Sequence, residues 1–174
     1  MRKTMLFAGV ALLALGLATP AFAGKVGFVD LQKIMDLTRT GQDFKKQLAA
    51  KSDELTIAGK KKDLEFRSMV DAYKKSEAAL ADAAKQSKQE ELQKKYQEMA
   101  QFQQQAMEEM TAFKLDGMKK IFAKIKEITQ KLAASGGYDI ILLKADDEAT
   151  ESSFVLYGAS SVDLTDLVVR QMNP

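Results

Sequence analysis

Residues 42–134 contain no proline, and Gly59 and Gly117 are the only glycines among them. Proline breaks a helix interior and glycine weakens it, so this stretch can continue as helix far beyond the usual length of about 11–12 residues. Alanine, glutamine, lysine and glutamate dominate it, and apolar residues recur at helical spacing. Two helices of such length cannot bury all their apolar surface as a pair. We therefore expect a long helical arm that assembles with copies of itself or binds another chain.

Apolar residues in this stretch follow the heptad spacing of a coiled coil. The longer stripe runs through Leu92, Tyr96, Met99, Phe102, Ala106, Met110, Phe113, Gly117, Ile121, Ile125, Ile128 and Leu132. Residues 83–89 lack a large apolar side chain, and Ser87 and Glu90 have the spacing of a capping box. We therefore predict a helical hairpin that turns near residue 88, with arms of about 67 Å each. One continuous helix of about 140 Å is the alternative.

The two glycines of the arm would be level with each other if the chain turned at residue 88. Each lowers helix stability by about 1 kcal/mol relative to alanine, so we interpret Gly59 and Gly117 as a hinge. Met107 and Met118 lie just off the apolar stripe. Because methionine adapts its shape to varied partners, these two are our candidates for binding a client chain, meaning a protein that the arm would hold.

The first 23 residues have the pattern of a secretory signal peptide. Arg2 and Lys3 are positive, residues 5–18 are mostly apolar, and Pro20 precedes the small-residue site that ends at Ala23. A membrane anchor would need about 20 apolar residues, more than this run provides. We expect cleavage after Ala23 and export of the mature chain.

The charges of the mature chain nearly cancel. Without Arg2 and Lys3, 24 basic residues balance 24 acidic ones. Residues 42–134 hold 19 basic and 15 acidic residues, whereas residues 135–174 hold 2 and 7. Nucleic-acid binding requires a basic surface, so we expect no nucleic-acid partner.

The residue inventory argues against catalysis. Cysteine and histidine are absent, which excludes disulfides, thiol catalysis and histidine-ligated metals. No P-loop, glycine-rich dinucleotide loop or nucleophile motif occurs. Neighbouring glutamates such as Glu90 and Glu91 lie on helix faces, where charged runs are normally solvated. The sequence therefore predicts that the chain is no enzyme and binds no cofactor or metal.

Strand patterns occur at both ends of the mature chain. Residues 25–31, 138–143 and 154–157 are rich in Val, Ile, Leu, Phe and Tyr. Since these segments are far apart in sequence, we expect them to meet in one small sheet, with the arm inserted between them.

Capping residues are expected at the helix ends. Asp30 would cap a short helix, Thr40 the first long helix and Asp163 a last helix. Gly136 and Gly137 would end the second long helix, as glycine does at helix C-termini.

The predicted fold class is therefore α+β. Residues 24–41 and 135–174 form a small β-body, and residues 42–134 form a long antiparallel coiled-coil hairpin inserted in it. The body carries more large apolar side chains than a small monomer can expose. We predict that these residues form the interface of an oligomer; they are Val26, Phe28, Val29, Ile140, Ile141, Leu142, Phe154 and Val155.

Four short segments resemble the Skp/OmpH family of periplasmic chaperones. They are Lys-Val-Gly-Phe-Val-Asp-Leu-Gln-Lys-Ile at residues 25–34, Thr-Gly-Gln at residues 40–42, Tyr-Asp-Ile-Ile-Leu at residues 138–142 and Val-Asp-Leu-Thr-Asp at residues 162–166. The resemblance implies a homotrimer whose β-body holds three helical arms around a cavity. It also implies that the arms hold unfolded outer-membrane proteins in the periplasm without ATP.

Two other functions stay open on the sequence alone. A structural or adaptor coiled coil of the cell envelope, bound to a folded partner, would share the arms and the assembly. A protein that contacts anionic lipid or lipopolysaccharide could use lysines that flank the two glycines, namely Lys60, Lys61, Lys62, Lys114, Lys119 and Lys120.

Overall fold

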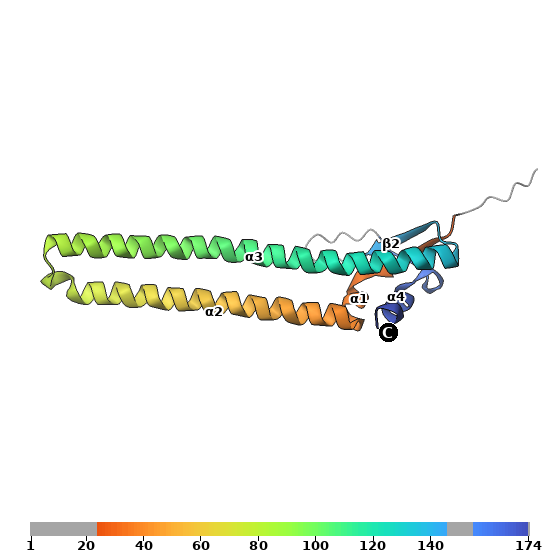
Figure 1. The fold of residues 1–174 in the computed structure, drawn as a ribbon, viewed down its shortest axis with the longest axis horizontal. Helices are drawn as coiled ribbons and strands as arrows, with labels where there is room; N and C mark the ends of the chain where they lie inside the picture. The colour runs from red at the N-terminus through yellow and green to blue at the C-terminus, as the bar shows by residue number, and fades with distance from the viewer. Residues whose placement is uncertain (1–23, 146–154, 174) are drawn as a thin grey trace, which may run out of the picture.

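The computed structural model of the protein describes residues 24–145 and 155–173. Two long helices lie side by side and extend from a small body (Figure 1). Helix α2 spans Arg39–Ser76 and helix α3 spans Asp82–Gly136, which makes them about 57 Å and about 82 Å long. In the described ranges, no helix is long and apolar enough to cross a membrane.

The hairpin turns earlier in the chain than the capping-box pattern predicts. A short 3-10 helix, Glu77–Ala79, follows α2, and the backbone is extended at Leu80 and Ala81 before α3 begins. The predicted cap at Ser87, with its partner Glu90, lies inside α3. A turn near residue 88 is therefore wrong, and the break between the helices also excludes one continuous helix.

Side chains from both helices meet at this turn. The Ser76 hydroxyl donates to the Ala72 carbonyl at 3.0 Å, a local bond that competes with helix continuation. The Gln89 amide donates to the Tyr73 hydroxyl at 3.0 Å, and that hydroxyl donates to Glu77 at 3.1 Å. Of these three bonds, the one from Gln89 to Tyr73 connects α3 with α2, so contact between the helices contributes to the position of the turn.

The body is built around two parallel strands. Strand β1 (Val26–Asp30) pairs with β2 (Ile140–Lys144) along its whole length. Parallel neighbours need a long crossover connection, and here the arm provides it. On the other side of β1, Phe28 forms a bridge with Asp163, and the Leu164 N–H donates to the Phe28 carbonyl at 2.8 Å. Both chain ends therefore contribute to the body, as predicted.

The predicted strand at residues 154–157 is not found in the part of it that the structure describes. Phe154 lies outside the described residues, and residues 155–157 have no strand conformation. The second edge of β1 is occupied by the segment at Asp163, so that edge is not free for these residues. Leu156 and Tyr157 are instead almost fully exposed.

The first two helices begin at capping residues. Asp30 accepts a backbone N–H at 3.0 Å and caps α1 (Leu31–Leu37), as predicted. Helix α2 is capped by Thr38, whose hydroxyl accepts the N–H of Gly41 at 3.1 Å. The predicted cap, Thr40, lies in the first turn of α2. Thr38 takes this role because its backbone is extended, as an N-cap requires.

The remaining helix ends agree with the predicted residues in part. A 3-10 helix, Ser160–Val162, leads into α4 (Thr165–Met172). The N-cap position of α4 is Leu164 and not the predicted Asp163, although the Asp163 carboxylate accepts the backbone N–H of Thr165 at 2.9 Å. Helix α3 ends at Gly136 and is capped by Gly137, whose φ of 64° is the left-handed conformation that glycine adopts most easily.

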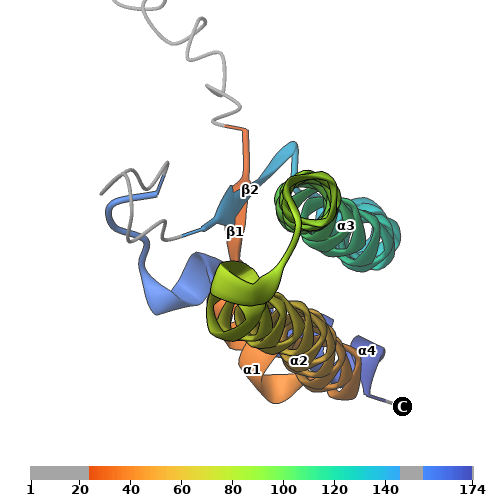
Figure 2. The ribbon, with the colours of Figure 1, turned by 90° about the vertical axis from the view of Figure 1, so that its left-hand side faces the viewer.

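The hydrophobic core lies where the arm enters the body. Figure 2, a view along the arm from its tip, shows the strands beside α3 and the short helices α1 and α4 beside α2. The buried side chains come from β1, the helices and the residue before α4, and strand β2 adds only partly buried ones; the buried cluster contains Val29, Ile34, Met35, Phe44, Ile121, Ile125, Ile128, Leu164, Val168 and Met172. The residues that stabilise the body therefore also fix the base of the arm.

Candidate functional site

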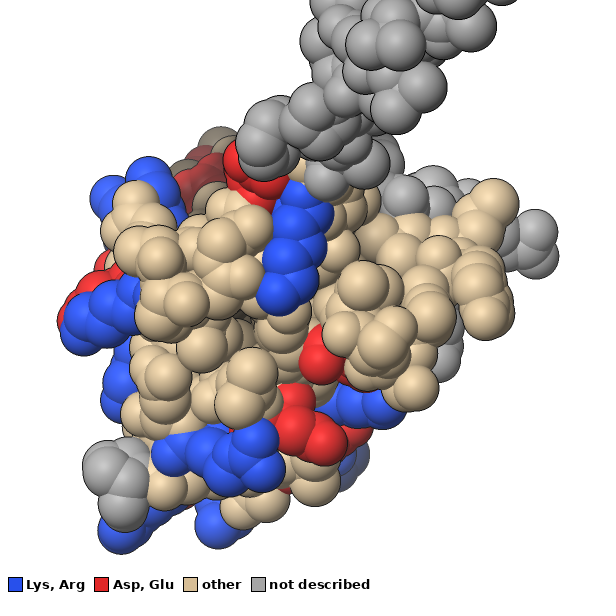
Figure 3. Space-filling view, turned by 90° about the vertical axis from the view of Figure 1, so that its right-hand side faces the viewer, with Lys and Arg blue, Asp and Glu red and all other residues tan. Residues whose placement is uncertain are grey.

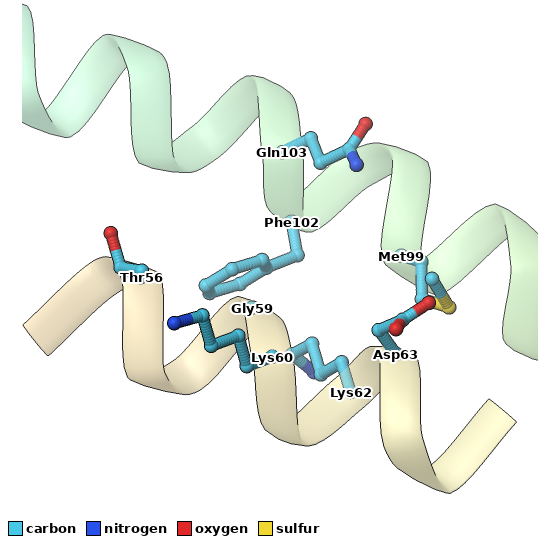
Figure 4. Close-up of a pocket in the computed structure, with 8 residues that line it drawn as sticks. All are labelled: Thr56, Gly59, Lys60, Lys62, Asp63, Met99, Phe102 and Gln103. Carbon is cyan, nitrogen blue, oxygen red and sulfur yellow. The ribbon is translucent and has the colours of Figure 1, made fainter. Parts of the chain in front are cut away.

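Gly59 of α2 lies opposite Phe102 of α3, partway along the arm (Figure 4). A Cβ atom added to Gly59 would be 3.5 Å from the Phe102 ring. Gly117 is not at this level, because it lies against the ring of Phe44 closer to the body. The predicted alignment of the two glycines is therefore wrong. The early turn of the hairpin shifts the partner of each α2 residue toward the N-terminus of α3.

An open groove lies between the helices at this point. Two adjoining hollows, of about 300 Å³ and about 580 Å³, share Thr56, Gly59, Phe102 and Gln103. We call their combined surface the arm groove. Its main lining residues are Thr56, Gly59, Met99, Phe102, Met107 and Met110.

Gly59 contributes to the groove because it places no side chain between the helices at this level. Toward the body, Phe44 and Phe113 stack with ring centres 6.4 Å apart. Toward the tip, the ring centres of Phe66 and Tyr96 are 6.1 Å apart. Between these two contacts, Gly59 supplies no side chain to the seam. Protein interiors are normally close-packed, so a missing side chain leaves an accessible hollow.

Methionine side chains give the groove an adaptable apolar surface. Met99, Met107 and Met110 line it, and Met107 is 72% exposed. The Lys62 ammonium lies 5.3 Å from the centre of the Phe102 ring, which is a cation–π contact. Methionine is unbranched and polarisable, so it packs against partners of different shape. The groove can therefore bind apolar segments without selecting one sequence.

Ion pairs connect the two helices on either side of the groove. The Lys51 ammonium lies 2.6 Å from Glu109, and the Lys95 ammonium lies 3.6 Å from Glu65. The hydrogen bond to Glu109, with a second one to Glu54, raises the pKa of Lys51. These pairs favour one alignment of the helices. Within the described residues, no acidic cluster is arranged to hold a metal ion.

The two predicted client-binding methionines lie in different surroundings. Met107 is in the arm groove, whereas Met118 is about 16 Å further along α3. Met118 packs, partly buried, against the core of the body. Sequence reasoning assigned Met99 and Phe102 to the helix seam and did not identify the groove. Only the correct position of the turn could have revealed that Phe102 faces a glycine.

The lysines near the two glycines do not form one belt. Residues 60–62 lie at the level of the groove, whereas Lys114, Lys119 and Lys120 flank Gly117 nearer the body. Lys120 is paired with Asp116 at 2.7 Å. Contact with anionic lipid or lipopolysaccharide therefore stays a prediction without an assigned site.

The predicted oligomer residues fall into two groups in the body. Val26, Ile140 and Leu142 are 43%, 53% and 43% exposed. The residues that one chain already covers are Phe28, Val29 and Val155, which are buried, and Ile141, which is partly buried. The second group differs from expectation because these side chains pack within the protomer: Val29 and Ile141 belong to the core or pack against it, and the Phe28 ring lies against Gly158.

The exposed group forms part of an apolar surface on the body. Aligned residues of neighbouring strands point to the same face, so Val26, Ile140 and Leu142 share one face of the sheet. Leu156 and Tyr157 add further exposed apolar surface to the body. Uncharged side chains cover much of this end of the molecule (Figure 3). Apolar patches of this kind commonly mark protein–protein contacts.

Comparison with known proteins identifies the family. Residues 25–172 match the family model described as outer membrane protein (OmpH-like). The chain belongs to the OmpH-like family. This membership confirms the family resemblance found in the sequence.

A solved structure shares the fold of this OmpH-like protein. It is the crystal structure of a candidate outer membrane chaperone (OmpH-like) from Caulobacter crescentus CB15, with a TM-score of 0.72. The match covers 93% of this chain and 90% of the other, at 17% sequence identity. At this identity the likeness shows the fold alone. No curated protein matches the chain.

Proposed function

We propose that the protein is a holdase chaperone of the periplasm, which keeps unfolded outer-membrane proteins soluble without ATP until they are assembled. The observation that carries this proposal is the arm groove, an open methionine-lined surface on a projecting hairpin. Membership of the OmpH-like family supports the same function. Apolar contacts that are individually weak suit a client that must later be released.

We also propose that three copies assemble through their bodies and place their arms around a common cavity. The exposed face of Val26, Ile140 and Leu142 supports this assembly. Several arms around one client raise its effective concentration near each groove without a strong single contact. Sedimentation equilibrium at micromolar concentration is expected to give the mass of a trimer. A stable monomer would remove the cavity from the proposal.

We propose separate roles for the body and the arm. Residues 24–41 and 135–174 serve as the assembly body, and residues 42–134 serve as the binding arm. Residues 1–23, which lie outside the described residues, act as the export signal and are removed after Ala23. The mass of the protein recovered from the periplasm is expected to correspond to a chain that begins at Gly24.

The proposed role of the groove in client binding can be tested with an outer-membrane β-barrel protein diluted from urea. The native protein is expected to suppress light scattering at low stoichiometry. Met107→Gln is expected to weaken client binding by roughly tenfold, because loss of one buried methionine contact corresponds to about 1.5 kcal/mol. Helix content should not change, since Met107 is 72% exposed.

Leu115→Gln is the matched control. Leu115 is 66% exposed on the same helix and does not line the arm groove. If both variants bind the client like the native protein, the groove is not the binding site. If the native protein fails to keep the barrel soluble but binds a folded envelope protein, the adaptor function replaces the holdase function.

A further inference from the structure

The first two described residues are joined to the segment just before β2. The backbone N–H of Lys25 donates to the Asp139 carboxylate at 2.7 Å. In return, the backbone N–H of Asp139 donates to the Lys25 carbonyl at 2.8 Å. Gly24 also lies against this carboxylate, because a Cβ atom added to Gly24 would be 3.1 Å from Asp139 Oδ2. Asp139 therefore contacts the segment that follows the expected cleavage site.

The Lys25 ammonium does not pair with the Asp139 carboxylate. The Lys25 ammonium donates to the Gly136 carbonyl at 2.9 Å, and it lies 4.0 Å from the centre of the Tyr138 ring. That position places it at the C-terminus of α3, where a cation is favourable. In the part of the chain that the structure describes, no lysine or arginine forms a salt bridge with Asp139.

We propose that Asp139 is the binding site for the new amino terminus, the α-ammonium of Gly24 that forms when residues 1–23 are removed. The inference rests on cleavage after Ala23. In the uncleaved chain the Gly24 nitrogen is a neutral amide with one proton to donate. After cleavage it becomes an ammonium with three donors, and it is bonded to the Cα atom that lies beside the carboxylate. Hydrogen bonds between charged partners are stronger than those between neutral ones.

Removal of residues 1–23 would then add an ion pair to the body of the molecule. Gly24 lies two residues before the start of β1, and Asp139 lies one residue before the start of β2. An ion pair at this point would join the segments that lead into the two parallel strands. The chain that still carries its leader lacks this pair, so it gains the full stability of the body only after export. Glycine at position 24 suits the arrangement, because a side chain there would press against Asp139.

The test compares four mature chains purified after export at equal protein concentration. They are the native chain, Asp139→Asn, a chain with Gly-Ser inserted between Ala23 and Gly24, and the combination of both changes. Asparagine keeps an oxygen that can accept the Lys25 N–H and removes the charge. The insertion moves the ammonium by up to about 7 Å. Intact mass first establishes the first residue of each chain.

We expect Asp139→Asn to lower Tm by about 2 °C in the native chain and to have little further effect in the extended chain. The pKa of the terminal amine, followed by NMR after isotopic methylation, should be higher in the native chain than in the other three. Lys25 and Asp139 are the charged groups that the structure places at this corner.

Two outcomes would overturn the inference. A purely structural role for Asp139 would lower Tm equally in the native and extended chains and leave the pKa of the amine unchanged. A mass that places the first residue elsewhere than Gly24 would overturn both this inference and the proposed cleavage site. Neither outcome affects the holdase function, because client binding is measured separately.

Discussion

Gly59 and Gly117 belong to the same hairpin but have different neighbours. At Gly59 an added methyl group would be at ordinary van der Waals distance from Phe102. At Gly117 the Phe44 ring occupies the place that a Cβ atom would take. Gly117 therefore allows an aromatic ring to approach the α3 backbone closely, which is a packing reason for glycine. Gly59 has no such reason, and its effect is to leave the arm groove open.

Alanine substitutions should separate these two roles. Gly59→Ala is expected to stabilise the protein by about 1 kcal/mol, the usual advantage of alanine in a helix. Gly117→Ala is expected to destabilise it by about 1–3 kcal/mol, because the Phe44 ring must move. Urea unfolding followed by circular dichroism gives both values. Similar effects of the two substitutions would contradict the assigned packing.

The hinge interpretation of these glycines stays a prediction. If Gly59 allows the arm to bend, Gly59→Ala should narrow the distribution of arm-to-arm distances measured with spin labels near Ala84. An unchanged distribution would leave Gly59 with a role in the groove alone. Gly117→Ala is not a matched control here, because it also disturbs the contact with Phe44.

At the scale of the elements, features set by neighbouring residues were predictable and features set by helix pairing were not. The cap at Asp30 and the glycine end of α3 depend on a few adjacent residues, and both agree with the sequence. The pattern at Ser87 and Glu90 is also compatible with a helix interior, where it lies. The turn instead depends on which α3 residues face α2.

The error in the predicted position of the turn also affected the prediction of the candidate site. An error of a few residues in the turn changes the predicted partner of Gly59 by about twice as many positions. The predicted partner of Gly59 was therefore Gly117 instead of Phe102, and the groove was not identified. Met107 could still be proposed from sequence, because its position off the apolar stripe is independent of the turn. The burial of Phe28 and Val29 was missed because it depends on residues distant in sequence: Phe28 lies against Gly158, and Val29 packs in the core formed by the helices.

The ion pair between Lys51 and Glu109 predicts that the folded arm becomes less stable at alkaline pH. The hydrogen bond to Glu109 raises the pKa of Lys51 above its ordinary value. The pair therefore contributes fully below the pKa of Lys51 in the unfolded chain, and its contribution is lost as the pH rises through the folded value. Unfolding of the native protein should become easier above about pH 10.

Lys51→Met isolates this effect, because it removes the titrating group and keeps an apolar stem. The difference in Tm between the native protein and this variant should shrink as the pH rises from about 9 to about 12. Other lysines titrate equally in both chains and therefore cancel. A difference that stays constant over this range would show that the pair does not affect stability.

At the scale of the whole molecule, we expect the net charge of the arm to be too small to dominate the proposed client binding. Residues 42–134 hold 19 basic and 15 acidic residues, and several of them pair with each other, as Lys51 does with Glu109 and Lys95 with Glu65. The lysines on the arm are also spread over two levels rather than gathered in one belt. Under the proposed function, we therefore expect the apolar groove to be the main contact with a client.

Client affinity should therefore depend only moderately on salt. Raising the salt from about 20 mM to about 150 mM is expected to weaken binding by less than about tenfold, since exposed charges contribute little and are screened. Fluorescence titration with a labelled unfolded barrel protein measures this. If affinity instead falls by orders of magnitude while Met107→Gln has no effect, binding is electrostatic.

Helix α3 runs without a break from the buried residues Ile121, Ile125 and Ile128 to its start at the arm tip. It can therefore act as a lever about 58 Å long between Ile121 and Asp82. A tilt of about 10° at the core would move the tip by about 10 Å, roughly the diameter of a helix. In the proposed trimer, such tilts would widen or narrow the mouth of the cavity with little change in the arms themselves. The range of client sizes would then be determined by how tightly three isoleucines pack in the body.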